Sequence, residues 1–163
     1  MGLTIARLEP RDWPEVRRIY QEGIDSGQAT FETSVPSWEE WDAGKNQMCR
    51  LAAAKEGILI GWAALSPVSQ RQVYVGVAEV SIYITNGLRG QGTGKALLQE
   101  LINCSEQAGI WMLQAVMFPE NEASVALHAA CGFRLVGRRE RIAAQYGIWR
   151  DTVLLERRST TVG

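Results

Sequence analysis

The sequence is poor in the residues on which metal centres and disulfide frameworks depend. It has one histidine, His128, and three widely spaced cysteines, Cys49, Cys104 and Cys131. A histidine-rich zinc or iron site is therefore excluded, and the cysteines form neither a disulfide framework nor a C-x-x-C metal pattern. A Ser-His-Asp triad would have a single possible base, which weakens most hydrolase interpretations. We expect no metal cofactor, and reduced thiols in a cytoplasmic protein.

The chain also lacks an excess of charge of either sign. Its 17 basic and 18 acidic residues leave a net charge of −1, which argues against binding to nucleic acid or an anionic membrane through bulk electrostatics. No apolar run approaches the length of a transmembrane helix, and the first six residues lack the features of a secretory signal. With 163 residues, 46% of them apolar, the chain can bury its own core. We expect one domain over 1–163, with no nucleic-acid or membrane partner.

Apolar periodicity and turn residues predict alternating strands and helices. The expected strands cover residues 4–8, 49–55, 58–65, 77–84, 112–118, 133–136 and 149–156, and the expected helices cover 12–26, 37–46, 96–108 and 122–131. Over 77–84 apolar and polar residues alternate, which places Glu79, Ser81 and Tyr83 on the face opposite the core. This order predicts an α/β or α+β layered domain, with a mixed sheet flanked by helices.

A glycine-rich loop, Arg89-Gly90-Gln91-Gly92-Thr93-Gly94-Lys95, joins the strand 77–84 to the helix 96–108. A strand, a glycine turn and a helix start together form an anion site, because free backbone amides and the positive helix end converge. The spacing does not fit a P-loop, which needs Ser or Thr where this chain has Ala96, nor the dinucleotide fingerprint G-x-G-x-x-G. A loop that merely begins a helix is the alternative.

The pattern Arg89-x-x-Gly92-x-Gly94, placed after this strand, resembles the acyl-CoA site of the GNAT N-acetyltransferases. The chain is most similar to their phosphinothricin and methionine-sulfoximine acetyltransferase branch. The resemblance spans nearly the whole chain. Further matches to the family are Asn121-x-x-Ser124, Leu127-His128 and Cys131-Gly132-Phe133-Arg134. The matches to the branch are Ala29-Thr30-Phe31, Gly61-Trp62-Ala63, Ala78 to Ile84 and Gly147 to Asp151. The resemblance implies a GNAT-like, mostly antiparallel mixed sheet, acetyl-CoA as cosubstrate, and a homodimer. Aromatic anchors such as Trp38, Trp41 and Trp149 also favour a dimer interface.

The resemblance further implies which residues hold coenzyme A. In that family the loop amides hold the pyrophosphate, and the backbone of the preceding strand pairs with the pantetheine arm. The positions that match are Ile82, Tyr83, Ile84, Arg89, Gly90, Gln91, Gly92, Thr93, Gly94, Lys95, Asn121 and Ser124. For Asn121, capping of its helix is an alternative to contact with the cofactor.

Amine acetylation needs a neutral amine beside a thioester, a path for the amine's proton and an acid for the leaving thiolate. Glu79 is the candidate base, because it lies on the polar face of the strand expected to pair with pantetheine, and the branch implies the same role. His128 stands where many GNAT enzymes have a tyrosine as the thiolate's acid. An imidazole can donate or shuttle a proton near neutral pH, which leaves its direction open. The alternative for Glu79 is a solvated carboxylate on a half-exposed strand, and the alternative for His128 is a helix residue that only packs.

By resemblance, Phe31, Arg71 and Tyr74 line the amino-acid pocket. A guanidinium suits a carboxylate or phosphinate, although loop arginines are usually solvated. The leading hypothesis is an acetyl-CoA-dependent N-acetyltransferase. It would acetylate the α-amine of a phosphinothricin, methionine sulfoximine or methionine sulfone type of amino acid by direct transfer in a ternary complex. The alternatives are a GNAT enzyme for protein N-termini or another small amine, and a silent acyl-CoA-binding module.

Overall fold

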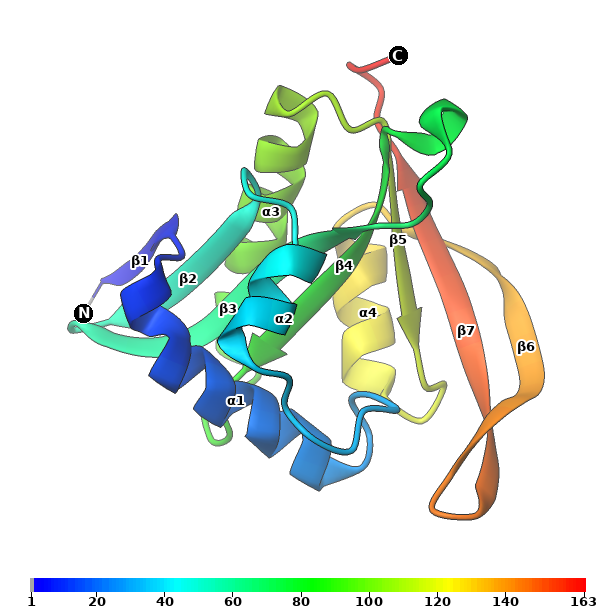
Figure 1. The fold of residues 1–163 in the computed structure, drawn as a ribbon, viewed down its shortest axis with the longest axis horizontal. Coiled ribbons are helices and arrows are strands. Elements are labelled where there is room, and N and C mark those ends of the chain that lie inside the picture. Colours follow the sequence, from blue (N-terminus) through cyan, green and yellow to red (C-terminus); the bar gives the residue numbers. More distant parts are fainter. Residues whose placement is uncertain (1) are drawn as a thin grey trace.

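One mixed sheet runs through the molecule (Figure 1). The computed structural model describes residues 2–163, whose seven strands are ordered β1-β2-β3-β4-β5-β7-β6. Their bounds are β1 Leu3–Arg7, β2 Arg50–Lys55, β3 Ile58–Pro67, β4 Val77–Ile84, β5 Met112–Met117, β6 Arg134–Gln145 and β7 Ile148–Arg158. All neighbouring pairs are antiparallel except β4 and β5. The predicted α/β domain with a mostly antiparallel mixed sheet is confirmed.

Helices cover both faces of the sheet. Their bounds are α1 Trp13–Ser26, α2 Trp38–Gly44, α3 Thr93–Gln107 and α4 Glu122–Ala130, with short 3-10 turns at Pro10–Asp12 and Gln72–Tyr74. Alternate residues of β3 pack on opposite sides, as the pleat of a strand requires. Trp62 joins the buried cluster formed with α1, whereas Ala63 and Leu65 join the cluster formed with α3. None of the helices within residues 2–163 is both long and apolar enough to cross a membrane.

The C-terminal hairpin is the largest departure from the predicted elements. The strand expected over 133–136 is far longer, because β6 extends to Gln145, and the strand expected over 149–156 runs slightly further at both ends, from Ile148 to Arg158. Tyr146 and Gly147 join them with φ values of 52° and 78°, which suits a two-residue hairpin turn. Two register shifts interrupt the β6–β7 pairing. These bulges break the alternation of apolar residues by which a strand is recognised in a sequence.

Helix boundaries differ by smaller amounts. The helix expected over 96–108 begins at Thr93, so the last three residues of the glycine loop form its first turn. The helix expected over 37–46 ends at Gly44, because Lys45 has an extended backbone with φ −110° and ψ 144°. The predicted capping box is present there, since the Ser37 hydroxyl accepts from the Glu40 amide and the Glu40 carboxylate accepts from the Ser37 amide.

The parallel strands β4 and β5 separate along their length. They pair only between residues 77–79 and 112–114, with Glu79 opposite Gln114 on the last rung. Figure 1 shows the two strands diverging beyond this point. The edge of β4 that faces β5 is therefore left without a strand partner from Val80 onward, and the opening lies beside α4.

Candidate active site

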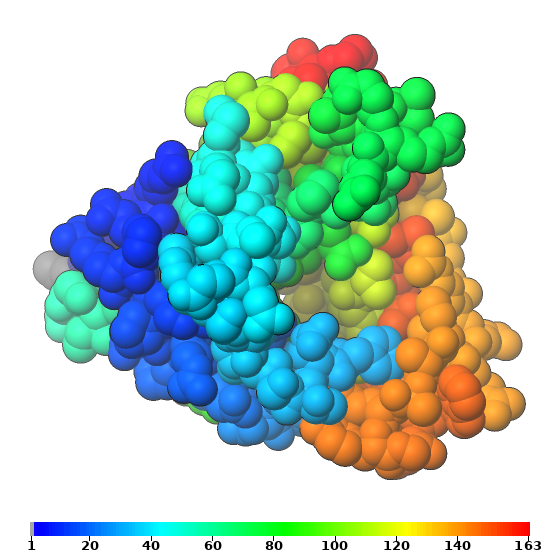
Figure 2. Space-filling view, viewed as in Figure 1, coloured from blue at the N-terminus to red at the C-terminus, as the bar shows by residue number. Residues whose placement is uncertain are grey.

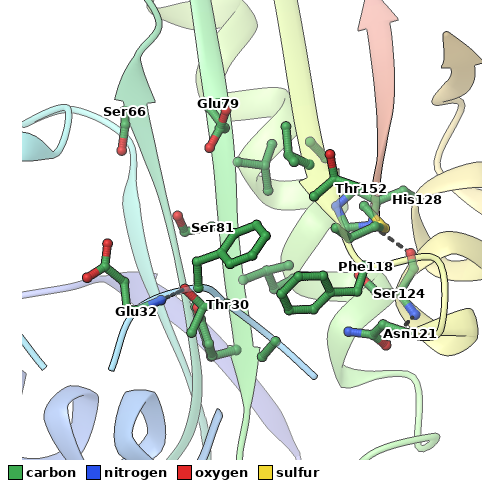
Figure 3. A pocket seen from close by; sticks show the side chains of 18 of the residues that line it. Thr30, Glu32, Ser66, Glu79, Ser81, Phe118, Asn121, Ser124, His128 and Thr152 are labelled. Atoms are coloured by element: carbon green, nitrogen blue, oxygen red, sulfur yellow. Dashed lines mark hydrogen bonds between the residues drawn. The ribbon is translucent and has the colours of Figure 1, made fainter. Parts of the chain in front are cut away.

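A cavity of about 360 Å³ lies where β4 and β5 separate. Figure 2 shows a hollow in this face, between the cyan segment of α2, the blue segment near residue 30 and the green residues above. Seven of the predicted site residues line the cavity, namely Phe31, Glu79, Ile82, Tyr83, Asn121, Ser124 and His128. Figure 3 shows Ser66 and Glu79 on one side of the opening and Asn121, His128 and Thr152 on the other.

Glu79 is fixed at the point where the two strands part. It is half-buried, and its Oε1 accepts a hydrogen bond of 2.7 Å from Nε2 of Gln114 on β5. The β3–β4 register runs without a bulge from Gly61 opposite Ile84 to Pro67 opposite Ala78. The predicted face of the strand is therefore confirmed, and the carboxylate is held in the cavity wall rather than on an open, solvated strand.

His128 projects from α4 into the opposite wall and is only 2% exposed. Its Nδ1 lies 2.8 Å from the carbonyl oxygen of Ser124. Because a carbonyl can only accept, Nδ1 carries the hydrogen, and Nε2 of the neutral ring is a bare acceptor. Nε2 is buried and has no hydrogen-bond partner within the described chain. Burial lowers the pKa of His128 below its ordinary value of 6.5, against the opposing effect of the Ser124 carbonyl.

This burial predicts a pH dependence of folding that one residue dominates. The unfolded chain binds a proton at His128 more readily than the native protein does. The free energy of unfolding should therefore fall as the pH drops below 6.5, by at most about 1.4 kcal/mol per pH unit. His128 is the only histidine, so His128→Asn should flatten the curve between pH 5.5 and 7. Urea unfolding at several pH values measures this, and an equally steep curve in the variant would contradict the assigned neutral ring.

The glycine loop leaves open space above the start of α3. Gly90 and Gly92 have φ values of 79° and 85°, and a Cβ built on either would meet no atom within 4 Å. Gly92 is the N-cap of α3, so the first amides of a 15-residue helix are directed at that space. Free amides at a helix start suit a diphosphate, which is consistent with the predicted pyrophosphate position of coenzyme A.

Tyr83 and Asn121 use their side chains within the protein. The Tyr83 ring stacks on Trp62 at 4.9 Å between centroids, so only its backbone is available at the free edge of β4. Asn121 Oδ1 accepts from the Ser124 amide, and its Nδ2 donates to the carbonyl of Gln28. The capping alternative for Asn121 is therefore what the structure shows.

The segment that carries Phe31 is tied to the other side of the cavity. Gln145 donates to the carbonyl of Thr30 at 2.7 Å, and Arg150 donates to that of Gly27 at 2.6 Å. The Arg150 guanidinium also lies over the ring of Phe118, at 3.5 Å from its centroid. Phe31 packs edge-on against the same ring. Arg150 lies in the segment Gly147 to Asp151, which the sequence analysis identified only by resemblance. Its contacts show that it holds the wall of the cavity that contains Phe31.

Arg71 and Tyr74 lie outside this arrangement. Both are exposed on the connection between β3 and β4, with the guanidinium 5.5 Å from the centre of the Tyr74 ring. Neither residue is among those that line the cavity. The lining instead contains Lys45, to which no sequence pattern points. Its Nζ donates to the hydroxyls of Ser66 and Ser81 at 3.0 and 3.4 Å.

The free edge of β4 and the helix start with free amides agree with the acyl-CoA site that the sequence resemblance implies. The chain belongs to the acetyltransferase (GNAT) family, whose model matches residues 9–133. It is 34% identical over 164 aligned residues to a phosphinothricin N-acetyltransferase from Alcaligenes faecalis, covering 94% of this chain and 81% of that protein.

Two further relatives agree with this assignment. An L-methionine sulfoximine/L-methionine sulfone acetyltransferase from Pseudomonas aeruginosa is 26% identical, over 96% of this chain and 94% of that protein. The crystal structure of a GNAT superfamily phosphinothricin acetyltransferase from Sinorhizobium meliloti in complex with AcCoA superposes with a TM-score of 0.86 and 32% identity, covering 97% and 89% of the two chains. The protein is an N-acetyltransferase with acetyl-CoA as its cosubstrate.

Proposed function

We propose that the protein acetylates the α-amine of a small amino acid of the phosphinothricin, methionine sulfoximine or methionine sulfone type. The observation that carries this proposal is the cavity with Glu79 in one wall and the bare Nε2 of His128 in the other. Its volume of about 360 Å³ suits a small acceptor. The names of the two curated relatives support the same class of acceptor.

The cofactor positions belong to the same proposal. The loop 89–95 would hold the pyrophosphate on its amides, and the free edge of Ile82 to Ile84 would pair with pantetheine. Ser124 and Asn121 line the opening that the pantetheine arm would enter. Bound acetyl-CoA supplies an acetyl thioester that an amine can attack.

The protein's own residues then manage the protons of a direct transfer. Glu79 accepts a proton from the acceptor's ammonium, directly or through water. His128 begins as a proton acceptor at Nε2. It takes the amine's second proton as the C–N bond forms, and returns that proton to the thiolate of coenzyme A as the C–S bond breaks. No cysteine is among the described residues that line the cavity, and burial raises the pKa of the thiols of Cys49 and Cys131. These thiols are thus poor candidates for a covalent intermediate.

A screen of thiol release from acetyl-CoA tests the acceptor class. Phosphinothricin, methionine sulfoximine and methionine sulfone should be turned over with higher kcat/KM than simple alkylamines or peptide N-termini. Faster turnover of peptides or alkylamines would instead favour the alternative GNAT activities. Binding of acetyl-CoA without thiol release for any amine would identify a silent module.

Gly92→Asp should raise the Kd for acetyl-CoA at least tenfold, because a side chain there enters the open space above α3 and brings a negative charge to the diphosphate position. Gly109→Asp is the matched control. Gly109 also has a left-handed backbone, with φ +80° and no atom within 4 Å of a built Cβ, but it follows the other end of α3. A carboxylate is less favourable there than at the N-terminus. If calorimetry gives Gly92→Asp the same Kd for acetyl-CoA as the wild type, the loop does not bind the pyrophosphate.

We also propose a homodimer in the reducing cytoplasm, where the three cysteines stay free. Trp41 is 2% exposed and so does not serve as an anchor on the surface, whereas Trp38, which stacks on it, is half-buried. The C-terminal hairpin instead exposes Ile148 and Trp149 at 67% and 56%. Light scattering should give twice the 18.1 kDa mass of one chain. A mass that stays at 18.1 kDa at every concentration would contradict this prediction.

A further inference from the structure

Lys45 is the one lysine or arginine among the described residues that line the cavity. Its extended backbone ends α2 and turns the chain towards the sheet. The two hydroxyls that it contacts belong to adjacent strands, Ser66 on β3 and Ser81 on β4. Ser66 lies directly opposite Glu79 in the β3–β4 register. The ammonium is therefore held on the same polar face of the sheet as the carboxylate of Glu79.

Within residues 2–163 no carboxylate is in direct contact with this ammonium. None of the ion pairs between described residues includes Lys45. An ammonium has three donors, and its hydrogen-bond partners among the described residues are two neutral hydroxyls, which leaves a donor for a ligand. Burial lowers the pKa of Lys45, while the carboxylates of Glu79 and Glu32 act in the opposite direction. A partly buried ammonium without an ion-pair partner opposes folding, and an anionic ligand would stabilise it.

The charges of the wall complement those of an amino acid. Glu79 and Glu32 are negative and line the cavity with Lys45. Residues two positions apart in a strand, such as Glu79 and Ser81, are about 7 Å apart on one face. An acceptor with an ammonium at Glu79 would therefore direct a carboxylate towards the ammonium at Ser81. Arg71, with its exposed guanidinium outside the lining, is not placed to do this.

We propose that Lys45 is the anchor for the α-carboxylate of the acceptor, and that it thereby turns the α-amine towards Glu79. This inference rests on the proposed amino-acid acceptor and names the group that selects it. Because an anchoring contact is present in both ground and transition states, its loss should raise KM more than it lowers kcat.

A matched pair of acceptors tests the anchor. Methionine sulfone and its α-carboxamide carry the same side chain and α-amine, and only the acid offers a carboxylate. We expect Lys45→Met to lower kcat/KM for the acid about 10- to 100-fold, the range for a lost hydrogen bond to a charged group, mainly through KM. The carboxamide should change less than threefold. Lys45→Arg should restore part of the preference for the acid.

Two further variants separate this role from its alternatives. Lys55→Met removes a lysine outside the cavity lining and should leave the acid-to-amide ratio unchanged. Arg71→Ala should also leave the ratio unchanged. Equal losses for both acceptors in Lys45→Met, or loss of the preference in Arg71→Ala alone, would overturn the anchor. A wild type that acetylates neither acceptor would contradict the proposed function and the anchor with it.

The Tm distinguishes loss of the anchor from damage to the fold, because we expect the first to raise the Tm and the second to lower it. At neutral pH a lysine whose pKa is lowered in the native state opposes folding, because burial disfavours its charged form. Lys45→Met should therefore raise the Tm without acceptor while it weakens binding of the acid. A lower Tm together with equal losses for both acceptors would assign Lys45 a structural role only.

Discussion

Replacing Glu79 by glutamine should lower kcat/KM by about 10²- to 10⁴-fold at low pH, the range for loss of a general base. At low pH few acceptor amines are neutral, so removal of the ammonium proton depends most on the enzyme. At high pH the amine is already neutral, and the difference between variant and wild type should narrow. Glutamine preserves the geometry, because its amide oxygen can still accept from Nε2 of Gln114. The pH–rate profiles of the two enzymes measure the effect.

Two controls test whether the loss of activity in Glu79→Gln is specific to proton transfer. The Kd for acetyl-CoA should be unchanged in Glu79→Gln, because the glycine loop lies at the other end of β4. Gln114→Leu removes the donor to Glu79 and keeps the carboxylate, so it should retain the shape of the wild-type profile. If Glu79→Gln keeps the wild-type profile at every pH, Glu79 is not the base.

The parts of the site that the sequence predicts are those fixed by local structure. The face on which Glu79 lies follows from strict alternation over 77–84, and the structure adds no bulge to reverse it. The proposed anion site follows from glycines beside a helix start, and both Gly90 and Gly92 have the left-handed backbone that favours glycine. These features depend on residues that are neighbours in the chain.

The parts that the sequence does not predict depend on contacts between distant segments. Lys45 reaches its hydroxyl partners 21 and 36 residues further along the chain. Its direction follows from the backbone at the end of α2 and from the β3–β4 pairing, neither of which has a local signal. The position of Arg71 likewise depends on the path of a loop. The sequence shows that this loop contains a cationic side chain, but it does not show whether that side chain reaches the cavity.

The same distinction applies to the C-terminal hairpin. Arg138 to Arg141 is a charged run that breaks apolar alternation, and β6 exists there because β7 pairs with it across two bulges. The hairpin matters to the site because Gln145 and Arg150 project from it to hold the segment of Phe31. The β6–β7 hairpin thus supports one wall of the cavity, although β6 can be identified as a strand only from its pairing with β7.

His128→Ala should lower kcat by about 10²- to 10⁴-fold and leave the Kd for acetyl-CoA within about twofold. The sequence leaves the direction of proton transfer at this residue open, and the carbonyl of Ser124 supports a hydrogen on Nδ1. In the proposed mechanism the ring therefore starts each cycle with Nε2 free to take a proton from the amine, and it returns that proton to the thiolate. Removal of the ring removes both steps, whereas binding of the cofactor at the loop 89–95 does not involve it.

His128→Asn separates this chemistry from packing. An asparagine amide can donate to the Ser124 carbonyl as Nδ1 does, but it has no group in the position of Nε2. The asparagine variant should therefore be as slow as the alanine variant although it keeps the contact within α4. Acetyl-CoA binding by calorimetry and single-turnover rates of thiol release distinguish the two roles. Near wild-type turnover in His128→Asn, or a loss below threefold in His128→Ala with an intact fold, would show that the histidine only packs against Phe133.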